Sequence, residues 1–166
     1  MTFPEVVRGL SAGDFSRLAP LFDVPPGRST CQIISWYEAG LFAAEPTALA
    51  EAVTCAAFNG AVDVLDHLLA RGANPSGGAG TGLNAIHWAA NRGQLRAVEC
   101  LLRYQAPLES VNAYGGTTLG CAVWSAVHEP LPDLVLRAVG SRAGSTHGPI
   151  VFQNSLAVNG RSPRRF

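Results

Sequence analysis

The sequence predicts an all-α fold in which about three to four helix pairs stack into a solenoid. The first observation is an internal repeat of 33 residues, because residues 51–75 align with residues 84–108 at seven identical positions. The second is the spacing of Leu95, Val98, Leu101 and Leu102, which places them on one apolar helix face. Each such pair leaves an apolar face that a stacked neighbour must bury.

The first 46 residues depart from this repeat. Residues 3–23 are interpreted as an atypical helical unit, because aligning Gly13 with Gly60 places four apolar residues at the repeat's apolar positions. Residues 24–46 form an insert that is too long for an ordinary connection. It begins with the turn 25–28, and residues 31–43 are predicted to be one extra apolar helix.

Three repeats follow, at residues 47–78, 79–111 and 112–140, and together with the segments before them they make one domain, 1–140. The third repeat is irregular: residues 127–131 read as a lengthened loop before Pro132, which suits the start of a helix over 133–139. Residues 141–166 are predicted to be an irregular C-terminal extension, in which 150–158 is either a strand or a truncated capping element.

The repeat resembles a known family. Residues 82–93 are similar to the ankyrin pattern G-x-T-P-L-H-x-A-A-x-x-G, and residues 70–75 resemble the L-x-x-G-A-D motif that ends an ankyrin repeat. Residues 112–119 fit D-x-x-G-x-T-P-L with Thr118 in place of proline. The resemblance implies an ankyrin-repeat solenoid that acts in protein–protein interaction, as an adaptor or an inhibitor.

The resemblance also implies a partner-binding surface, made of the fingers between repeats and the exposed end of each first helix. Aromatic residues and arginine recur there, and these types dominate binding energies at interfaces. The alternative for Phe58 and Trp124 is that the irregular segments cover them. The expected binding residues are Phe58, Asn59, Thr81, Leu83, Asn91, Arg92, Ala113, Tyr114, Gly116, Trp124 and Ser125, and we expect Tyr114, Arg92 and Trp124 to form one patch.

The alternative function is a small-molecule binder or an enzyme, whose site would be built by residues 31–43 and 150–166. A closed pocket with convergent polar groups would support it. No catalytic residue is assigned, since the resemblance implies that His87 ties neighbouring repeats together by hydrogen bonds. The spacing of Asp63 and His67 favours a surface ion pair over a metal site.

Composition and motifs also indicate which classes of partner and cofactor are not expected. The twelve basic residues, all arginine, balance twelve acidic ones, which disfavours nucleic acid as a partner. Gly77–Gly82 lacks the lysine of a phosphate loop and is interpreted as a flexible finger. The sequence has neither a signal-peptide pattern nor an apolar run of membrane-spanning length, so we expect a cytoplasmic protein without membrane contact. The four scattered cysteines disfavour disulfides and zinc, and no cofactor or metal is expected.

Overall fold

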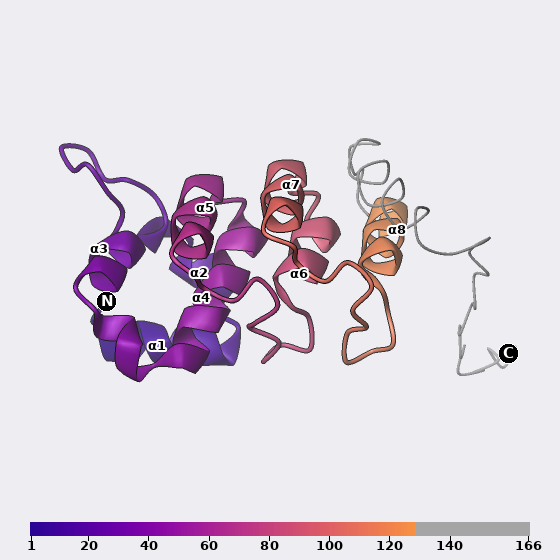
Figure 1. Ribbon diagram of the computed structural model, residues 1–166, viewed down its shortest axis with the longest axis horizontal. Coiled ribbons are helices and arrows are strands. Elements are labelled where there is room, and N and C mark those ends of the chain that lie inside the picture. Colours follow the sequence, from indigo (N-terminus) through magenta and orange to yellow (C-terminus); the bar gives the residue numbers. More distant parts are fainter. Residues whose placement is uncertain (129–166) are drawn as a thin grey trace, which may run out of the picture.

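The computed structural model describes residues 1–128, a row of helices joined by loops (Figure 1). No strand occurs in this part of the chain, and the predicted all-α class is confirmed. In chain order the helices are α1 (Phe3–Ala12), α2 (Phe15–Leu18), η1 (Ala19–Leu21), α3 (Gln32–Glu38), η2 (Leu41–Ala44), α4 (Pro46–Asn59), α5 (Val62–Ala70), α6 (Ala85–Asn91), α7 (Leu95–Arg103) and α8 (Thr118–His128), where η marks a 3₁₀ helix.

The helices from α4 onward stack in two rows. The first-helix row consists of α4, α6 and α8, and the second-helix row consists of α5 and α7 (Figure 1). Loops project from the same side of the stack before α6 and before α8. We call residues 77–82 finger 1 and residues 110–117 finger 2.

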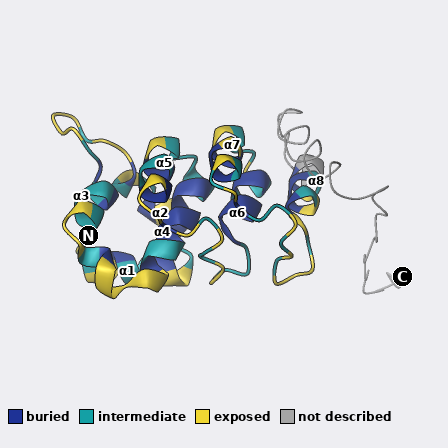
Figure 2. Cartoon of the chain, viewed as in Figure 1, coloured by how far each residue is buried: buried dark blue, intermediate teal, exposed yellow. Residues whose placement is uncertain are grey.

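Small residues let the first-helix row pack closely. Ala56, Ala57, Ala89 and Ala90 are completely buried, at the positions that the 33-residue repeat equates. Dark blue, which marks buried residues, accordingly fills the facing sides of α4 and α6 (Figure 2). Apolar side chains from both rows complete one continuous core.

Glycine ends the first helix of both complete pairs. Gly60 follows α4 with a φ of 69°, and Gly93 lies just beyond α6 with a φ of 67°. Their N–H groups donate to the carbonyl oxygens of Ala57 and Ala90. A residue with a side chain would be strained in this left-handed conformation, so glycine fixes where the chain turns back into the second helix.

The N-terminal helices do not repeat the arrangement of a stacked pair. Helix α2 packs against α4, and Asn59 Nδ2 donates to Phe15 O at 3.1 Å. The neighbour of α5 is instead α3, which comes from the insert. The expected single helix over residues 31–43 is wrong, because Gly40 has a φ of 76° and separates α3 from η2.

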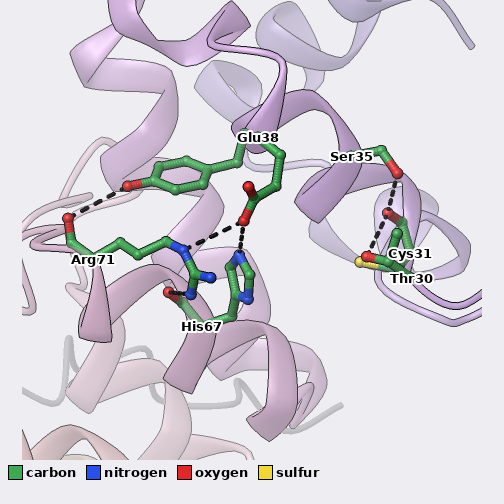
Figure 3. Close-up of polar contacts among 7 residues, drawn as sticks. Thr30, Cys31, Ser35, Glu38, His67 and Arg71 are labelled. Atoms are coloured by element: carbon green, nitrogen blue, oxygen red, sulfur yellow. Dashed lines mark hydrogen bonds and ion pairs between the residues drawn. The ribbon is translucent and has the colours of Figure 1, made fainter.

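A polar cluster joins the insert to the second-helix row (Figure 3). His67 Nε2 lies 2.8 Å from Glu38 Oε1, and Arg71 Nε lies 3.3 Å from the same oxygen. Tyr37 on α3 adds a hydrogen bond to the carbonyl oxygen of Arg71. The ion pair predicted between Asp63 and His67 is therefore wrong, since the imidazole points to a carboxylate that the sequence places 29 residues earlier.

Two boundaries concern the C-terminal part of the chain. Val127 and His128 belong to α8, although the sequence pattern predicted a loop there. The helix expected at 133–139, the strand or cap at 150–158 and the extension 141–166 lie outside the described residues.

Candidate functional site

Finger 1 is fastened to α4 by two side chains. Thr54 Oγ1 lies 2.9 Å from Gly78 O and 3.3 Å from Gly77 O, and Glu51 Oε1 accepts a hydrogen bond from Gly80 N at 2.8 Å. A Cβ atom added at Gly77 would lie 2.7 Å from the Ala50 side chain, so the finger glycines permit close approach to the helix. The interpretation of residues 77–82 as a flexible finger is corrected, because these contacts hold it against α4.

Finger 2 is fastened to α6 at the equivalent positions. His87 Nε2 bonds to Ser110 O at 2.9 Å, while its Nδ1 accepts from Asn84 N at 3.4 Å. Asn84 Nδ2 donates to Ser110 Oγ at 3.0 Å. His87 therefore ties the second repeat to the finger of the third, and the structural role expected for it is confirmed.

The two fingers also contact each other. Ala113 N donates to Gly82 O at 2.9 Å, and the ring of Tyr114 lies against Gly82. Within finger 2, Asn112 Oδ1 accepts the N–H groups of Tyr114 and Gly116, both at 2.9 Å. These bonds satisfy the backbone of the finger and fix its tip relative to finger 1.

The buried polar groups beneath the fingers have shifted pKa values. Burial raises the pKa of the Glu51 carboxyl, although the Gly80 N–H partly opposes this shift, and the Glu51 Oε2 atom is buried without a hydrogen-bond partner. Burial also raises the pKa of the nearby Cys55 thiol. For His87, burial lowers the pKa, and its bond to Ser110 acts in the opposite direction. The imidazole is thus held neutral as a structural donor.

An aromatic cluster lies beside the C-terminal end of α4. The rings of Phe15 and Phe58 are 5.6 Å apart, those of Phe58 and Trp88 are 5.1 Å apart, and both pairs meet edge to face. Trp88 Nε1 donates to Thr81 Oγ1 at 2.8 Å, which links the cluster to finger 1. The guanidinium carbon of Arg92 lies 4.9 Å from the centre of the Phe58 ring.

Comparison with protein families agrees with this geometry. A family model described as ankyrin repeats (3 copies) matches residues 53–136, half of the chain. The chain belongs to the ankyrin-repeat family. No curated protein matches it. Ankyrin repeats are in general protein–protein interaction modules, which directs attention to the fingers and the first-helix row.

Several of the predicted binding residues also hold the ankyrin stack together. Asn59 bonds to the backbone of α2, and Thr81 accepts the Trp88 indole N–H. Ser125 is buried and donates to the carbonyl oxygen of Asn91, which joins α8 to α6. Leu83 is half-buried next to finger 1. For these residues a binding role stays a prediction, because their contacts already serve the fold.

The other predicted binding residues are more open. Tyr114 is 79% exposed and Trp124 is 61% exposed, while Arg92, Ala113 and part of Gly116 also reach solvent. Phe58 is half-buried, because Phe15 and Trp88 cover part of its ring. The alternative that an irregular segment covers Phe58 therefore holds in part, and the covering segment is the N-terminal α2.

The expected single patch is spread out along the first helices. Tyr114 precedes α8 on finger 2, whereas Trp124 is the seventh residue of α8, about 9 Å farther along the helix axis than its first residue. Trp124 and Arg92 flank the contact between Ser125 and Asn91. Arg92 and Trp124 thus lie toward the C-terminal ends of α6 and α8, away from the fingers, whereas Tyr114 lies on finger 2.

Two residues next to this surface were not predicted from the sequence: Phe15, which is buried beside Phe58, and Trp88, which is half-buried. A usable signal for Trp88 was present, since the repeat places cysteine at both equivalent positions, Cys55 and Cys121. A tryptophan where its equivalents are small indicates an extra role. Phe15 carried no comparable signal, because its contacts with α4 and α6 join distant parts of the chain.

A groove of about 610 Å³ runs along the N-terminal ends of α5 and α7. Cys31 and Ile34 of the insert line it, together with the exposed charged residues Asp63 and Arg96. Within residues 1–128 no group of three His, Cys, Asp or Glu side chains could hold a metal ion. None of the described helices is long and apolar enough to cross a membrane. The groove is open, unlike the closed pocket that would support a small-molecule site.

Proposed function

We propose that this ankyrin-repeat protein is an adaptor or inhibitor that holds a protein partner on finger 2 and on the exposed sides of α6 and α8. The observation that carries the proposal is the exposure of Tyr114 and Trp124 on this face. Large aromatic side chains supply much of the free energy of protein association when a partner buries them. Exposed aromatic side chains are therefore suited to binding.

The position of α2 supports the α6 and α8 part of the first-helix row, rather than α4, as the binding surface. Because α2 packs against α4 and covers part of Phe58, the N-terminal helices occupy the beginning of the first-helix row. Finger 2 and α8 have no such cover within the described residues. The scarcity of basic residues on this face argues for a protein partner over nucleic acid.

We also propose the cytoplasm as the place where the protein works. Cys31, Cys55, Cys100 and Cys121 are all buried and unpaired by disulfides. Reduced thiols of this kind suit the reducing environment of the cytoplasm.

The binding proposal is tested with the partner captured from the native host by the full chain and identified by mass spectrometry. Tyr114→Ala and Trp124→Ala should each weaken the affinity for the purified partner by about 2 kcal/mol, roughly thirtyfold, in isothermal titration calorimetry. The melting temperature should stay close to that of the wild type. Glu99→Ala, an exposed change on α7, serves as the control and should leave both quantities unchanged.

A double variant, Tyr114→Ala/Trp124→Ala, that keeps wild-type stability and full affinity would refute this surface assignment. Binding would then have to be sought on the insert or in the C-terminal part of the chain.

A further inference from the structure

Arg92 differs from the other arginines that contact neighbouring helices. Arg71 pairs with Glu38, and Arg103 pairs with Asp66 at 3.1 Å. Arg92 is exposed at the end of α6, and its guanidinium forms neither an ion pair nor a hydrogen bond with any residue from 1 to 128. Its guanidinium carbon lies over the Phe58 ring, 4.9 Å from the ring centre.

The stacking prepares this side chain for binding. An aromatic ring beneath the guanidinium carbon restricts where the guanidinium can move, and the exposed side chain keeps its N–H groups accessible to solvent. An ordered arginine loses less entropy when an acceptor arrives than a freely moving one. The Phe58 ring thus restricts the position of the Arg92 guanidinium and its N–H donors.

The helices and fingers of the proposed binding face contribute almost no charge. Helices α6 and α8 and fingers 1 and 2 contain no Asp, Glu, Lys or Arg, and the one acidic residue of α4, Glu51, is buried beneath finger 1. The nearest charges along the chain are Arg96 and Glu99, both on α7. Arg92 therefore borders a face of α6, α8 and the two fingers that has no charged residue of its own.

We propose that Arg92 receives one carboxylate of the protein partner, from an Asp or Glu side chain that has apolar or aromatic neighbours. This inference rests on the proposed function. A carboxylate matches the guanidinium fork with two parallel hydrogen bonds, and the neighbouring apolar residues would lie on the exposed ring of Trp124.

A carboxylate fits this site better than a phosphate group or the chain's own C-terminal part. Phosphate sites gather several cationic or N–H donors around a double charge, whereas α6, α8 and the two fingers supply no second cation beside Arg92. The chain beyond Asp133 contains five arginines and no acidic side chain, so this segment would repel Arg92. No carboxylate within residues 1–128 pairs with Arg92, and the proposal therefore assigns the complementary charge to the partner protein.

The experiment uses a phage-displayed library of random 12-residue peptides, selected on the immobilised full chain. The peptides that bind should share one Asp or Glu next to an aromatic or aliphatic residue. A fluorescent version of the best peptide is then titrated with the wild type and with Arg92→Gln, which should bind at least tenfold more weakly. Arg92→Lys, which keeps the charge but loses the fork, should fall between them.

A double-mutant cycle tests whether the loss of affinity comes from the pairing of Arg92 with the acidic residue of the peptide. Replacing the acid of the peptide by its amide should weaken binding to the wild type at least tenfold and should change binding to Arg92→Gln by less than threefold. Thermal melts of Arg92→Gln should match the wild type, because the side chain is exposed. Glu99→Gln is the matched surface control and should bind like the wild type.

Two failures are distinguishable. Peptides that require Trp124 but show no preference for an acid, or that bind Arg92→Gln as well as the wild type, would overturn the role of Arg92 and leave the proposed binding face intact. A stronger preference for phosphoserine than for glutamate would overturn the choice of carboxylate. Failure to select any peptide that depends on Tyr114 or Trp124 would count against the binding face itself.

Discussion

Finger 1 and finger 2 are held at the same repeat positions by different side chains. Thr54 and His87 are 33 residues apart, and each approaches the carbonyl oxygen at the start of the finger that follows, Gly77 or Ser110. Glu51 occupies the position of Asn84. The stacked arrangement fixes where the finger carbonyl falls, and any side chain that presents a donor there can fasten the finger.

The two anchors differ in how completely their polar atoms are satisfied. His87 and Asn84 bond to each other and to Ser110, whereas Glu51 leaves one buried oxygen without a partner. The stabilities of the two anchors also depend on pH in opposite directions. The raised pKa of Glu51 means that the fold favours its protonated form, and the lowered pKa of His87 means that the fold favours neutral imidazole. Finger 1 should therefore weaken as the pH rises, and finger 2 should weaken as the pH falls.

The largest effect is expected at the histidine anchor. His87→Ala should lower the free energy of unfolding by about 3 kcal/mol, because it opens a cavity and leaves the Ser110 carbonyl oxygen without its bond. Thr54→Val, at the equivalent position of finger 1, should cost about 1 kcal/mol, the value of one hydrogen bond. Urea denaturation of both variants measures the difference. Equal costs would show that the two anchors are equivalent after all.

Ala56 and Ala89 occupy equivalent positions in the contacts between stacked first helices. Ala89→Leu and Ala56→Leu should each cost about 1 to 3 kcal/mol, because three added carbons overpack the interface between stacked helices. Both positions are completely buried, so similar losses are expected in chemical denaturation. If neither variant is destabilised, the repeat register that equates Ala56 with Ala89 is incorrect.

The smallest effect is expected from Glu51→Gln. The stabilisation that wild-type Glu51 gains from its raised pKa is present at low pH and is lost as the pH rises above 4.5 through the folded-state value. Gln does not titrate, so the stability of the variant relative to the wild type should increase between pH 4.5 and pH 8. Denaturant melts across this range measure the trend, and a constant difference would contradict the assigned shift. Exposed Glu99→Gln provides the control.

The contribution of His87 to stability has the opposite pH dependence to that of Glu51. Because its folded-state pKa lies below the ordinary value of 6.5, its contribution to stability is present above that pH and is lost as the pH falls below it. The variant His87→Ala should lack this loss of stability at low pH, while it keeps the loss of stability that Glu51 causes as the pH rises.

The sequence predicted contacts that recur with the repeat. The 33-residue period located the buried alanines, and the ankyrin motif located His87 as the tie between neighbouring repeats, because both depend on units of known spacing. The prediction failed at His67, whose partner Glu38 comes from the insert, outside the repeat. It also failed at finger 1, where glycines were taken as a sign of flexibility but serve close packing against α4.

The sequence by itself determined the helices of the regular repeats, their pairing and the residues that face the stack, since apolar spacing and glycine stops are local properties of the chain. Only the tertiary structure decided that α2 packs on α4, that Phe15 and Phe58 share a cluster with Trp88, and that Arg92 stacks on Phe58. The reason is that these features depend on which distant side chains meet, and no periodic pattern in the chain encodes the path of a nonrepeating segment.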